Sequence, residues 1–549
     1  MDQLADLELH GLCLPEYLGG MNCPFVIYLL NAEIMGRADV SIMAHHSFHG
    51  GMAMAMLMYS VIEGSSQLDL EQGRLLSSRF DEPIREILAG RAWGSMDITE
   101  ADAGSDMAQL RTRGEVDDAG AWTVTGQKIF ITSGHGRYHF VLARTEDATA
   151  DDPMAGLAGL SLFLVEAYSV DDSGDKVWRA TVSRVEEKLG HHMSATVTVD
   201  FEQTPAQLIG KRGDGFKLML LIMNNARISV GFESLGLCES AWRMARDYAQ
   251  QRRSMGKAIA RHEMLADWLD EMQTDIEGIR ALAVAAAIRE ESCQRKTLEM
   301  LYLHGENSAE RKALEVEVKA LRWQSRLVTP LVKLRSSEKA VQIARRCLQI
   351  HGGHGYMTEY GAEKLLRDAL VLPIYEGTTQ IQALMATKDS LLWIMKNQGA
   401  FIRSMADARW RATTSDALGK RVAAIRYQAL SAQRALILRI LKRKFRTTKG
   451  LSLSDRRMAF TSWEPRTDFA PALLHAERLA QILTDAAIVE ELHKQAVAHP
   501  ERTSVLLRSL RRAEPRCRDL VYRIQQTGDA LLDELENQDA DIDMQAAAK

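Results

Sequence analysis

Lys128-Ile-Phe-Ile-Thr-Ser-Gly134 lies in a stretch, residues 93 to 201, whose hydrophobic pattern differs from that of its neighbours. Short β-branched and aromatic runs are separated there by Gly, Asp and Ser, which is typical of an antiparallel sheet or a small barrel. These runs are Trp122-Thr-Val-Thr, Lys128-Ile-Phe-Ile-Thr, Phe140-Val-Leu-Ala, Leu160-Ser-Leu-Phe-Leu-Val and Ala195-Thr-Val-Thr-Val-Asp-Phe. The pattern predicts a β domain inserted between helical segments.

The rest of the 549-residue chain favours long helices. It has only 11 Pro and 6% aromatic residues, while 46% hydrophobic and 26% charged residues are ordinary for a globular protein and exclude disordered and collagen-like classes. We therefore predict an α+β fold that is mainly α. The predicted divisions are an N-terminal α domain (1–92), a middle antiparallel β domain (93–204), a C-terminal α-bundle domain (205–395) and an additional helical module (396–549).

Two local features interrupt the helical pattern. Gly50-Gly51 predicts a break before a Met-rich run that starts at Met52, and the charged stretch from Gln294 to about Glu317 predicts a surface insertion. The methionines either fill gaps in a core or form an adaptable apolar pocket wall, and the sequence leaves both interpretations open.

Charge is spread unevenly along the chain. The net charge is −5, but residues from Lys396 onward carry 27 Lys and Arg against 19 Asp and Glu, a balance of +8. Within this module Leu436, Ile437, Ile440 and Leu441 form an apolar stripe, with Arg439, Lys442, Arg443 and Arg446 opposite. This basic face is either a solvated outer surface or a contact for a membrane surface or nucleic acid. The acidic stretch from Asp529 to Asp543 is expected to fray.

The compartment is predicted from what the chain lacks. The six cysteines are far apart and form no CxxC pair, which predicts neither a disulfide framework nor a metal site and fits a cytoplasmic protein. The longest apolar stretch, roughly Gly50 to Ile62, is too short to cross a bilayer, and the acidic N-terminus does not resemble a signal peptide. We expect a protein that is soluble or peripheral to a membrane.

Two segments of the β domain have the composition of a ligand site. Met96-Asp-Ile-Thr-Glu-Ala-Asp-Ala-Gly-Ser-Asp106 combines small and hydroxyl-bearing residues that let backbone amides approach a ligand. In Lys128-Ile-Phe-Ile-Thr132 the period of two places Phe130 and Thr132 on one strand face, an aromatic plane beside a hydroxyl. A strand that faces a core would show the same pattern.

Two further segments lie in the helical part. Gln251-Arg-Arg-Ser-Met-Gly-Lys257 ends a helix with cations and a hydroxyl that suit a diphosphate, although cations also stabilise a helix C-terminus by themselves. Gln349-Ile-His-Gly-Gly-His-Gly-Tyr356 implies close backbone approach to a bulky ligand. In Ile374-Tyr-Glu-Gly-Thr-Thr-Gln380 a carboxylate, Glu376, is flanked by apolar residues, a setting that raises its pKa and suits a base near neutral pH.

Together these segments resemble the acyl-CoA dehydrogenase family. The resemblance covers residues 5 to 395, about 70% of the chain, and is carried by TEADAGSD, KIFIT, the KLG-x-x-x-S-x-T segment at Lys188 to Thr196, RRSMGK, QIHGGHGY and IYEGTTQIQ, in this order. Each motif is weak alone, and their ordered co-occurrence is specific. The chain looks like the large bacterial type with a C-terminal helical extension, similar to long-chain and methylmercaptopropionyl-CoA dehydrogenases.

The resemblance implies an FAD site and an acyl-CoA site. Residues implied to bind FAD are Met96, Ile98, Thr99, Gly104, Ser105, Phe130, Thr132, Arg252, Ser254, Gln349, Ile350, Gly352, Gly353, Thr378 and Gln380. Residues implied to contact the acyl-CoA are Ser105, Asn224, Arg227 and Gly377. No metal is implied.

The implied activity is α,β-dehydrogenation of a fatty acyl-CoA to the trans-2-enoyl-CoA, a β-oxidation step of lipid metabolism. Glu376 matches the base that removes the α-proton, the β-hydrogen leaves as hydride to flavin N5, and an electron-transfer flavoprotein takes the electrons. A Glu at this position resembles the straight-chain subgroup. The extra helices imply a homodimer, with a tetramer as the alternative.

Two other functions remain open from the sequence, and the family pattern has departures. Related alkylation-response flavoproteins bind DNA through basic C-terminal surfaces, although no nucleic-acid role is expected here, and acyl-CoA oxidases share the chemistry. The first helix and a half of the family's N-terminal domain are expected to be missing. Ala101 replaces the usual Pro, His262-Glu263 replaces a Phe/His-Gln pair, and Asp97 is expected to put a charge beside the flavin.

Overall fold

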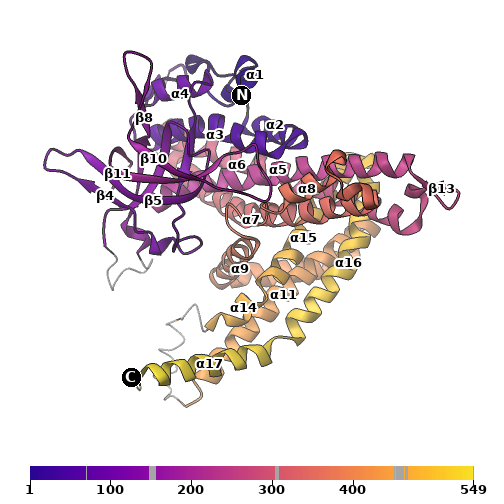
Figure 1. Cartoon of the computed structure of the whole chain (residues 1–549). Coiled ribbons are helices and arrows are strands. Elements are labelled where there is room, and N and C mark those ends of the chain that lie inside the picture. Colours follow the sequence, from indigo (N-terminus) through magenta and orange to yellow (C-terminus); the bar gives the residue numbers. More distant parts are fainter. Residues whose placement is uncertain are drawn as a thin grey trace. The chain divides into compact units, whose positions relative to one another are not determined.

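A computed structural model of the chain describes residues 1–69, 71–147, 156–302, 308–450, 452, 455, 463 and 468–547 (Figure 1). The chain divides into two compact units. The first comprises residues 1–266, 287–321 and 339–376, and the second comprises 267–286, 322–338 and 377–549. The four divisions predicted from the sequence follow other boundaries and stay a prediction.

The β domain of the first unit is a seven-stranded sheet whose order is β10-β11-β5-β4-β6-β3, with β7 paired to both β11 and β6. The path β11-β5-β4-β6-β7 therefore closes on itself like a small barrel, as the sequence predicts. The expectation of antiparallel pairing is wrong at β6, because both β3 and β4 pair parallel to this strand. The strands are β3 (Gly94–Asp97), β4 (Arg113–Val116), β5 (Trp122–Thr132), β6 (Tyr138–Arg144), β7 (Leu160–Glu166), β10 (Ala180–Val185) and β11 (Thr196–Ile209).

The β-branched and aromatic side chains of these runs form the interior of the barrel. Val124, Ile131, Phe163, Val197 and Phe201 are almost completely buried in one cluster. Because the side-chain period of a strand is two, the alternate residues of β3 and β5 face outward. The barrel core thus fixes which side chains the two strands present on their outer surface.

The N-terminal helices are α1 (Asp2–Asp6), α2 (Phe25–Ala38), α3 (Val40–Ile62) and α4 (Asp81–Leu88). The predicted break at Gly50-Gly51 is wrong, since both glycines lie inside α3. A Cβ at position 50 would lie 2.8 Å from the carbonyl oxygen of His10, so this glycine serves close packing. Met52 and Met56 are buried, which favours the core interpretation of the Met-rich run.

Long helices follow the β domain: α5 (Gly215–Gln251), α6 (Glu263–Tyr302), α7 (Ala309–His351) and the short α8 (Ala362–Ala369). The stretch predicted as a surface insertion, from Gln294 to about Glu317, is largely helical, and its described residues are half-buried or exposed except Leu314. It forms the end of α6 and the start of α7, and residues 303–307 of it lie outside the described residues.

The second unit holds the C-terminal helices: α9 (Thr379–Lys396), α10 (Gln398–Thr414), α11 (Ala417–Thr447), α14 (Ala470–Leu474), α15 (Ala476–Ala498), α16 (Thr503–Gln526) and α17 (Asp529–Ala547). Helices α11, α15 and α16 pack against one another. Leu391, Phe401 and Ile440 contribute to one apolar cluster of this unit. No described helix is long and apolar enough to cross a membrane.

The basic stripe of α11 differs from its prediction. Arg443 is 8% exposed and forms an ion pair with Glu536, and Arg439 forms one with Asp529. Arg446 lies 2.6 Å from Asp533. The acidic stretch expected to fray is the helix α17, whose carboxylates neutralise these arginines. A count of charges along the sequence could not show this pairing, because the partners are about 90 residues apart.

Candidate active site

The side chains of strand β3 alternate between the inside of the domain and its outer surface. Ser95 and Asp97 are fully buried, whereas Met96 and Ile98, which alternate with them, are half-buried; Thr99, in the turn after the strand, is also half-buried. The backbone N–H of Ile129 in β5 donates to the carbonyl oxygen of Thr99 over 2.9 Å, so β5 lies beside this turn.

Asp97 does not put a charge on this outer side, contrary to the expectation from sequence. Its carboxylate lies 2.8 Å from His139 Nδ1 and accepts a hydrogen bond from the Ser95 hydroxyl over 2.6 Å. All three side chains are inside the domain. The strand period, which places residues 95 and 97 on the opposite side from 96 and 98, could have predicted this inward direction.

Phe130 and Thr132 of β5 are both accessible, with the buried Ile131 between them. Phe130 is 62% exposed although it is a large apolar side chain, and its φ is +59°. The register of β5 against β11 shifts at this point, which is a β-bulge that re-aims the ring. The sequence left open whether Phe130 and Thr132 face a ligand or a core. In the structure neither side chain is buried in a core.

A buried ion pair fixes the turn after β3. Lys128 Nζ lies 2.8 Å from Glu100 Oε1 and also donates to the Ile98 carbonyl over 3.0 Å. Burial raises the pKa of Glu100, but Lys128 and the N–H groups of Arg111 and Thr112 outweigh it, so this pKa is lowered. The pair holds the strand surface, by which we mean Met96, Ile98, Thr99, Gly104, Ser105, Phe130 and Thr132.

The segment predicted to hold a diphosphate forms an exposed hairpin. Strands β12 (Arg253–Ser254) and β13 (Lys257–Ala258) are joined by Met255, which is 94% exposed. Arg252 and Ser254 are exposed, and the Ser254 hydroxyl is 3.0 Å from His262 Nε2. Both side chains are accessible to an anionic ligand from outside this unit.

The glycine-rich segment begins where α7 ends. Gly352 has φ +62°, and a Cβ at Gly352 or Gly353 would meet nothing within 4 Å. Gln349 is exposed, but Ile350 is 4% exposed, so only its backbone is available to a ligand. The open space in front of two adjacent glycines is a place where backbone can approach a bulky group.

Glu376 sits in a strained turn between α8 and α9. Its φ is +56°, a left-handed conformation that costs a non-glycine residue about 1–2 kcal/mol. Arg227 of α5, which is 3% exposed, donates from Nε to the Glu376 carbonyl oxygen over 3.2 Å. Burial lowers the pKa of Arg227, and the nearby Glu376 opposes that shift. Asn224, one turn earlier on the same helix, is half-buried.

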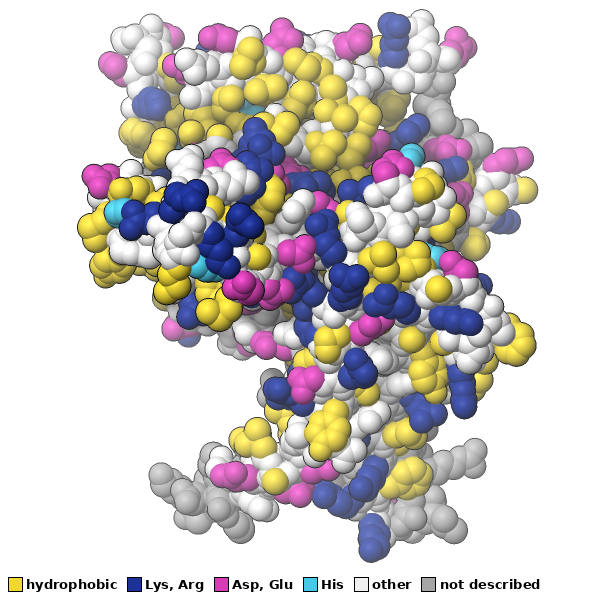
Figure 2. All heavy atoms as spheres, turned by 90° about the vertical axis from the view of Figure 1, so that its right-hand side faces the viewer, with side chains coloured by type: hydrophobic (Ala, Val, Ile, Leu, Met, Phe, Trp, Pro, Cys, Tyr) yellow, Lys and Arg dark blue, Asp and Glu magenta, His cyan; other side chains and the backbone are white. Residues whose placement is uncertain are grey.

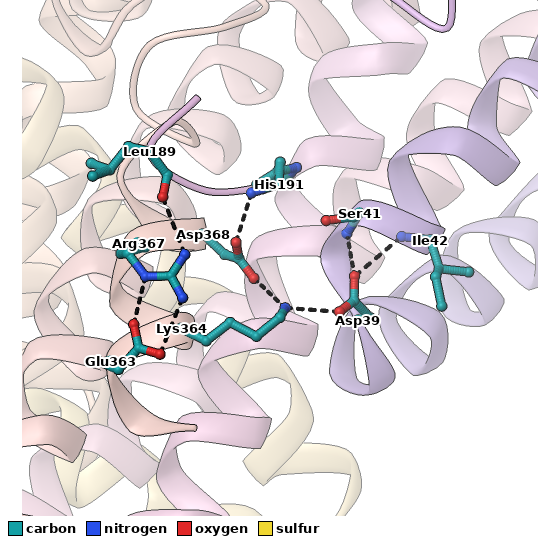
Figure 3. A network of polar contacts seen from close by, with 9 residues as sticks. All are labelled: Asp39, Ser41, Ile42, Leu189, His191, Glu363, Lys364, Arg367 and Asp368. Atoms are coloured by element: carbon teal, nitrogen blue, oxygen red, sulfur yellow. Dashed lines mark hydrogen bonds and ion pairs between the residues drawn. The ribbon is translucent and has the colours of Figure 1, made fainter. Parts of the chain in front are cut away.

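A polar network in the first unit joins the start of α3, the loop at His191 and α8 (Figure 3). Asp368 of α8 accepts from the backbone N–H of His191 over 2.7 Å and pairs with Lys364 over 2.5 Å. Lys364 also reaches Asp39, whose carboxylate caps the first turn of α3, over 2.8 Å. Sequence reasoning missed Lys364 and Asp39 because they are 325 residues apart. The network fixes the loop at His191 against α8.

The loop at His191 approaches α8 more closely than a side chain would allow. A Cβ on Gly190 would lie 2.5 Å from the Arg367 carbonyl oxygen. Arg367 donates to the Leu189 carbonyl over 3.2 Å and pairs with Glu363 over 2.5 Å. The glycine of the KLG segment is therefore required by packing.

The remaining predicted residues belong to the second unit. The Thr378 hydroxyl caps α9 by accepting from Ile381 N–H over 3.3 Å, and the Gln380 amide donates to Glu477 over 2.6 Å. The Gly377 carbonyl accepts from Lys333 over 2.8 Å. These contacts anchor the first turn of α9.

Comparisons with known proteins agree with this arrangement. Family models match the chain in order: "Acyl-CoA dehydrogenase, N-terminal domain" over residues 1–61, "middle domain" over 95–204 and "C-terminal domain" over 213–391. An acyl-CoA dehydrogenase of Bacillus subtilis is 30% identical over 383 residues, which cover 69% of this chain and 86% of that protein. The chain belongs to the acyl-CoA dehydrogenase family.

One further relative and one solved structure extend the comparison for this member of the acyl-CoA dehydrogenase family. A 3-methylmercaptopropionyl-CoA dehydrogenase of Ruegeria pomeroyi is 33% identical over 398 residues, 70% of this chain, and the match spans 61% of that protein. The crystal structure of an acyl-CoA dehydrogenase complexed with FAD from Bacillus anthracis covers 97% of this chain and 84% of its own, with a TM-score of 0.72 at 20% identity. The shared fold thus extends over the C-terminal helices.

The first unit of this family member offers groups that fit FAD, the cofactor of the family's dehydrogenases. Phe130 presents an exposed aromatic ring, and Gly104, Gly352 and Gly353 leave open space that their own unit does not fill. Arg252 supplies an exposed cation suited to a diphosphate. A flat ring system can stack on an exposed aromatic side chain, and glycines without a Cβ allow the backbone to approach a bulky cofactor closely.

Proposed function

We propose that this chain catalyses the FAD-dependent α,β-dehydrogenation of a fatty acyl-CoA thioester to the trans-2-enoyl-CoA. The observation that carries the proposal is Glu376, a carboxylate held at φ +56° by Arg227 at the end of the Ile374-Tyr-Glu segment. A strained residue persists only where its surroundings hold it, and such residues concentrate at active sites. Family membership supports the oxidoreductase chemistry, and the acyl chain remains to be identified.

In this proposal, different residues of the chain take the proton, orient the flavin and hold its diphosphate. The Glu376 carboxylate accepts the α-proton, and its backbone N–H is expected to donate to the thioester carbonyl, which acidifies the α-carbon by stabilising enolate-like charge. Bound FAD supplies the acceptor for the hydride that leaves the β-carbon. Phe130 and Thr132 orient the ring system, and Arg252 and Ser254 hold a diphosphate, in this proposal.

Other functions receive less support. On the face in Figure 2, Lys and Arg side chains are interspersed with acidic and hydrophobic ones. Together with the ion pairs between α11 and α17, this favours an enzyme over a DNA-binding flavoprotein, whose affinity would depend on accessible cations. Transfer of electrons to an electron-transfer flavoprotein and assembly as a homodimer are parts of the proposal that rest on the family resemblance.

The test is anaerobic titration of the FAD-loaded protein with acyl-CoAs of short, medium and long chain and one with a thioether in the acyl group. Bleaching of the flavin absorbance by one chain-length class, with enoyl-CoA as product, is expected. Unbleached flavin with every acyl-CoA would contradict the proposal. Peroxide formed in air at the rate of substrate oxidation would instead identify an oxidase.

A further inference from the structure

A second carboxylate lies close to the turn that carries Glu376. Glu233 of α5 is 2% exposed, and its Oε2 accepts a hydrogen bond from the hydroxyl of Tyr375. Burial first, and then the negative charge of Glu233, raise the pKa of Tyr375 well above its ordinary value, so the phenol remains a donor at neutral pH. Nothing in the reaction proposed above uses this pair.

Helix α5 thereby holds two consecutive residues of the turn. Glu233 holds the side chain of Tyr375, and Arg227, six residues earlier on the same helix, holds the backbone carbonyl of Glu376. The helix is a firm base, because Gly36 of α2 packs against the backbone of Glu233, where its Cβ would lie 3.0 Å from the Glu233 carbonyl oxygen. The anchors therefore come from a part of the unit that has little freedom to move.

The ring of Tyr375 has a second neighbour. His191 packs edge-on against it, with ring centroids 6.4 Å apart, and the backbone of His191 is fixed by Asp368 as described above. The Tyr375 side chain is thus held at its hydroxyl and against its ring. Since Tyr375 immediately precedes a residue with a left-handed φ, a shift of this ring would change the direction of the Glu376 side chain.

We propose that Glu233 is a positioning residue that acts through the Tyr375 hydroxyl to aim the Glu376 carboxylate at the α-carbon of the substrate. This inference rests on the proposed function, in which Glu376 is the base. Glu233 does not touch the reacting atoms. Its loss should slow proton abstraction without weakening the binding of the acyl-CoA.

The experiment compares Tyr375→Phe, Glu233→Ala and the double variant by stopped-flow reduction of the bound flavin over a range of acyl-CoA concentrations. We expect each single variant to lower the limiting rate about tenfold with half-saturation changed less than about threefold, since misplacement of a base affects the chemical step. The double variant should be no slower than the single ones, because both remove the same hydrogen bond. Glu233→Gln, which keeps an acceptor oxygen, should recover most of the rate.

Matched controls keep the result interpretable. Glu239→Ala removes an ion pair with Arg243 elsewhere on α5 and should leave the rate unchanged. FAD content and thermal melting are measured for every variant, and if Glu233→Ala does not fold, Tyr375→Phe, which removes only one oxygen atom, carries the test.

The inference would be overturned by rates equal to wild type in folded Tyr375→Phe, by multiplicative losses in the double variant, or by a loss confined to half-saturation. These outcomes leave the proposed function intact as long as the wild-type flavin is bleached. A wild-type flavin that no acyl-CoA bleaches would overturn the proposed function, and this inference with it.

Discussion

In helices α11 and α17 the charged side chains face one another, whereas on the strand surface of the first unit an apolar ring, that of Phe130, and an open glycine, Gly104, are accessible. Arg443 is buried against Glu536, but Phe130 is 62% exposed. In the region with the larger charge imbalance, three arginines of α11 (Arg439, Arg443 and Arg446) therefore pair with carboxylates of its own chain. The region with ordinary charge has groups that a ligand would cover. Net charge therefore does not locate the candidate site, which is recognised from its motif residues and their accessible groups.

The largest effect is expected for Glu376→Gln, which tests the outward-facing region directly. The amide cannot accept the α-proton, so the rate of flavin reduction should fall about 10³-fold or more while FAD stays bound. Stopped-flow absorbance measures it, and Glu359→Gln, an exposed glutamate close in sequence, serves as control. Flavin reduction in Glu376→Gln at a rate near that of wild type would contradict the assignment of Glu376 as the base.

Next is the buried ion pair beneath the strand surface. Lys128→Met leaves Glu100 buried without its main partner and should lower the free energy of unfolding by about 3–5 kcal/mol in urea denaturation. Combining it with Glu100→Gln should restore part of the loss. If the single variant were as stable as wild type, the pair would not support the strand surface.

The stability of the N-terminal helices should fall in acid, because three histidines of α3 (His45, His46 and His49) form a cluster with His10 inside the protein. Burial lowers the pKa of His10 to about 3, of His45 to about 4, and of His46 and His49 to about 3. The unfolded chain binds protons near pH 6.5 and the folded one does not, so stability is full above pH 6.5 and is lost as pH falls toward 3–4.

Each of these histidines should contribute up to about 1.4 kcal/mol of destabilisation at pH 5.5. Amide hydrogen exchange of α3 at pH 7.5 and 5.5, corrected for intrinsic rates, measures the effect. In His46→Gln, the difference in the opening free energy of α3 between pH 7.5 and 5.5 should be smaller by about that amount. An unchanged difference would refute the role of the cluster.

The smallest effect is expected in the C-terminal helices. Arg446 is 56% exposed in its ion pair with Asp533, and exposed pairs contribute about 1 kcal/mol or less. Arg446→Ala should therefore lower the free energy of unfolding in urea denaturation by less than that amount, and by still less in high salt. A loss of several kcal/mol would mean that α17 depends on this pair and that the contrast between the two regions is overstated.

Sequence patterns predicted the parts of the fold that depend on residues close together in the chain. The β-branched runs became the strands of the barrel because alternation of buried and exposed side chains is a property of neighbouring residues. Gly50-Gly51 does not break α3, because Gly50 serves tight packing against His10, which composition does not reveal. The inward direction of Asp97 was available from strand parity but was not used.

The site itself was predicted only where a motif carries it. The turn at Glu376 was located from the IYEGT segment, but Glu233 was not found, and Arg227 was expected to contact the acyl-CoA rather than to hold the turn. Glu233 lies 142 residues from Tyr375, and Lys364 lies 325 residues from Asp39, so neither contact leaves a local signal. The pairing of α11 with α17 was missed for the same reason.

The measurement that tests the central claim most directly uses an acyl-CoA carrying two deuterium atoms at each of the α- and β-carbons. The FAD-loaded protein is mixed with it anaerobically and the product is analysed by mass spectrometry. The account predicts an enoyl-CoA that has lost one deuterium from each carbon, in step with bleaching of the flavin. Loss from the α-carbon alone, or recovery of the substrate with all four deuterium atoms, would contradict it.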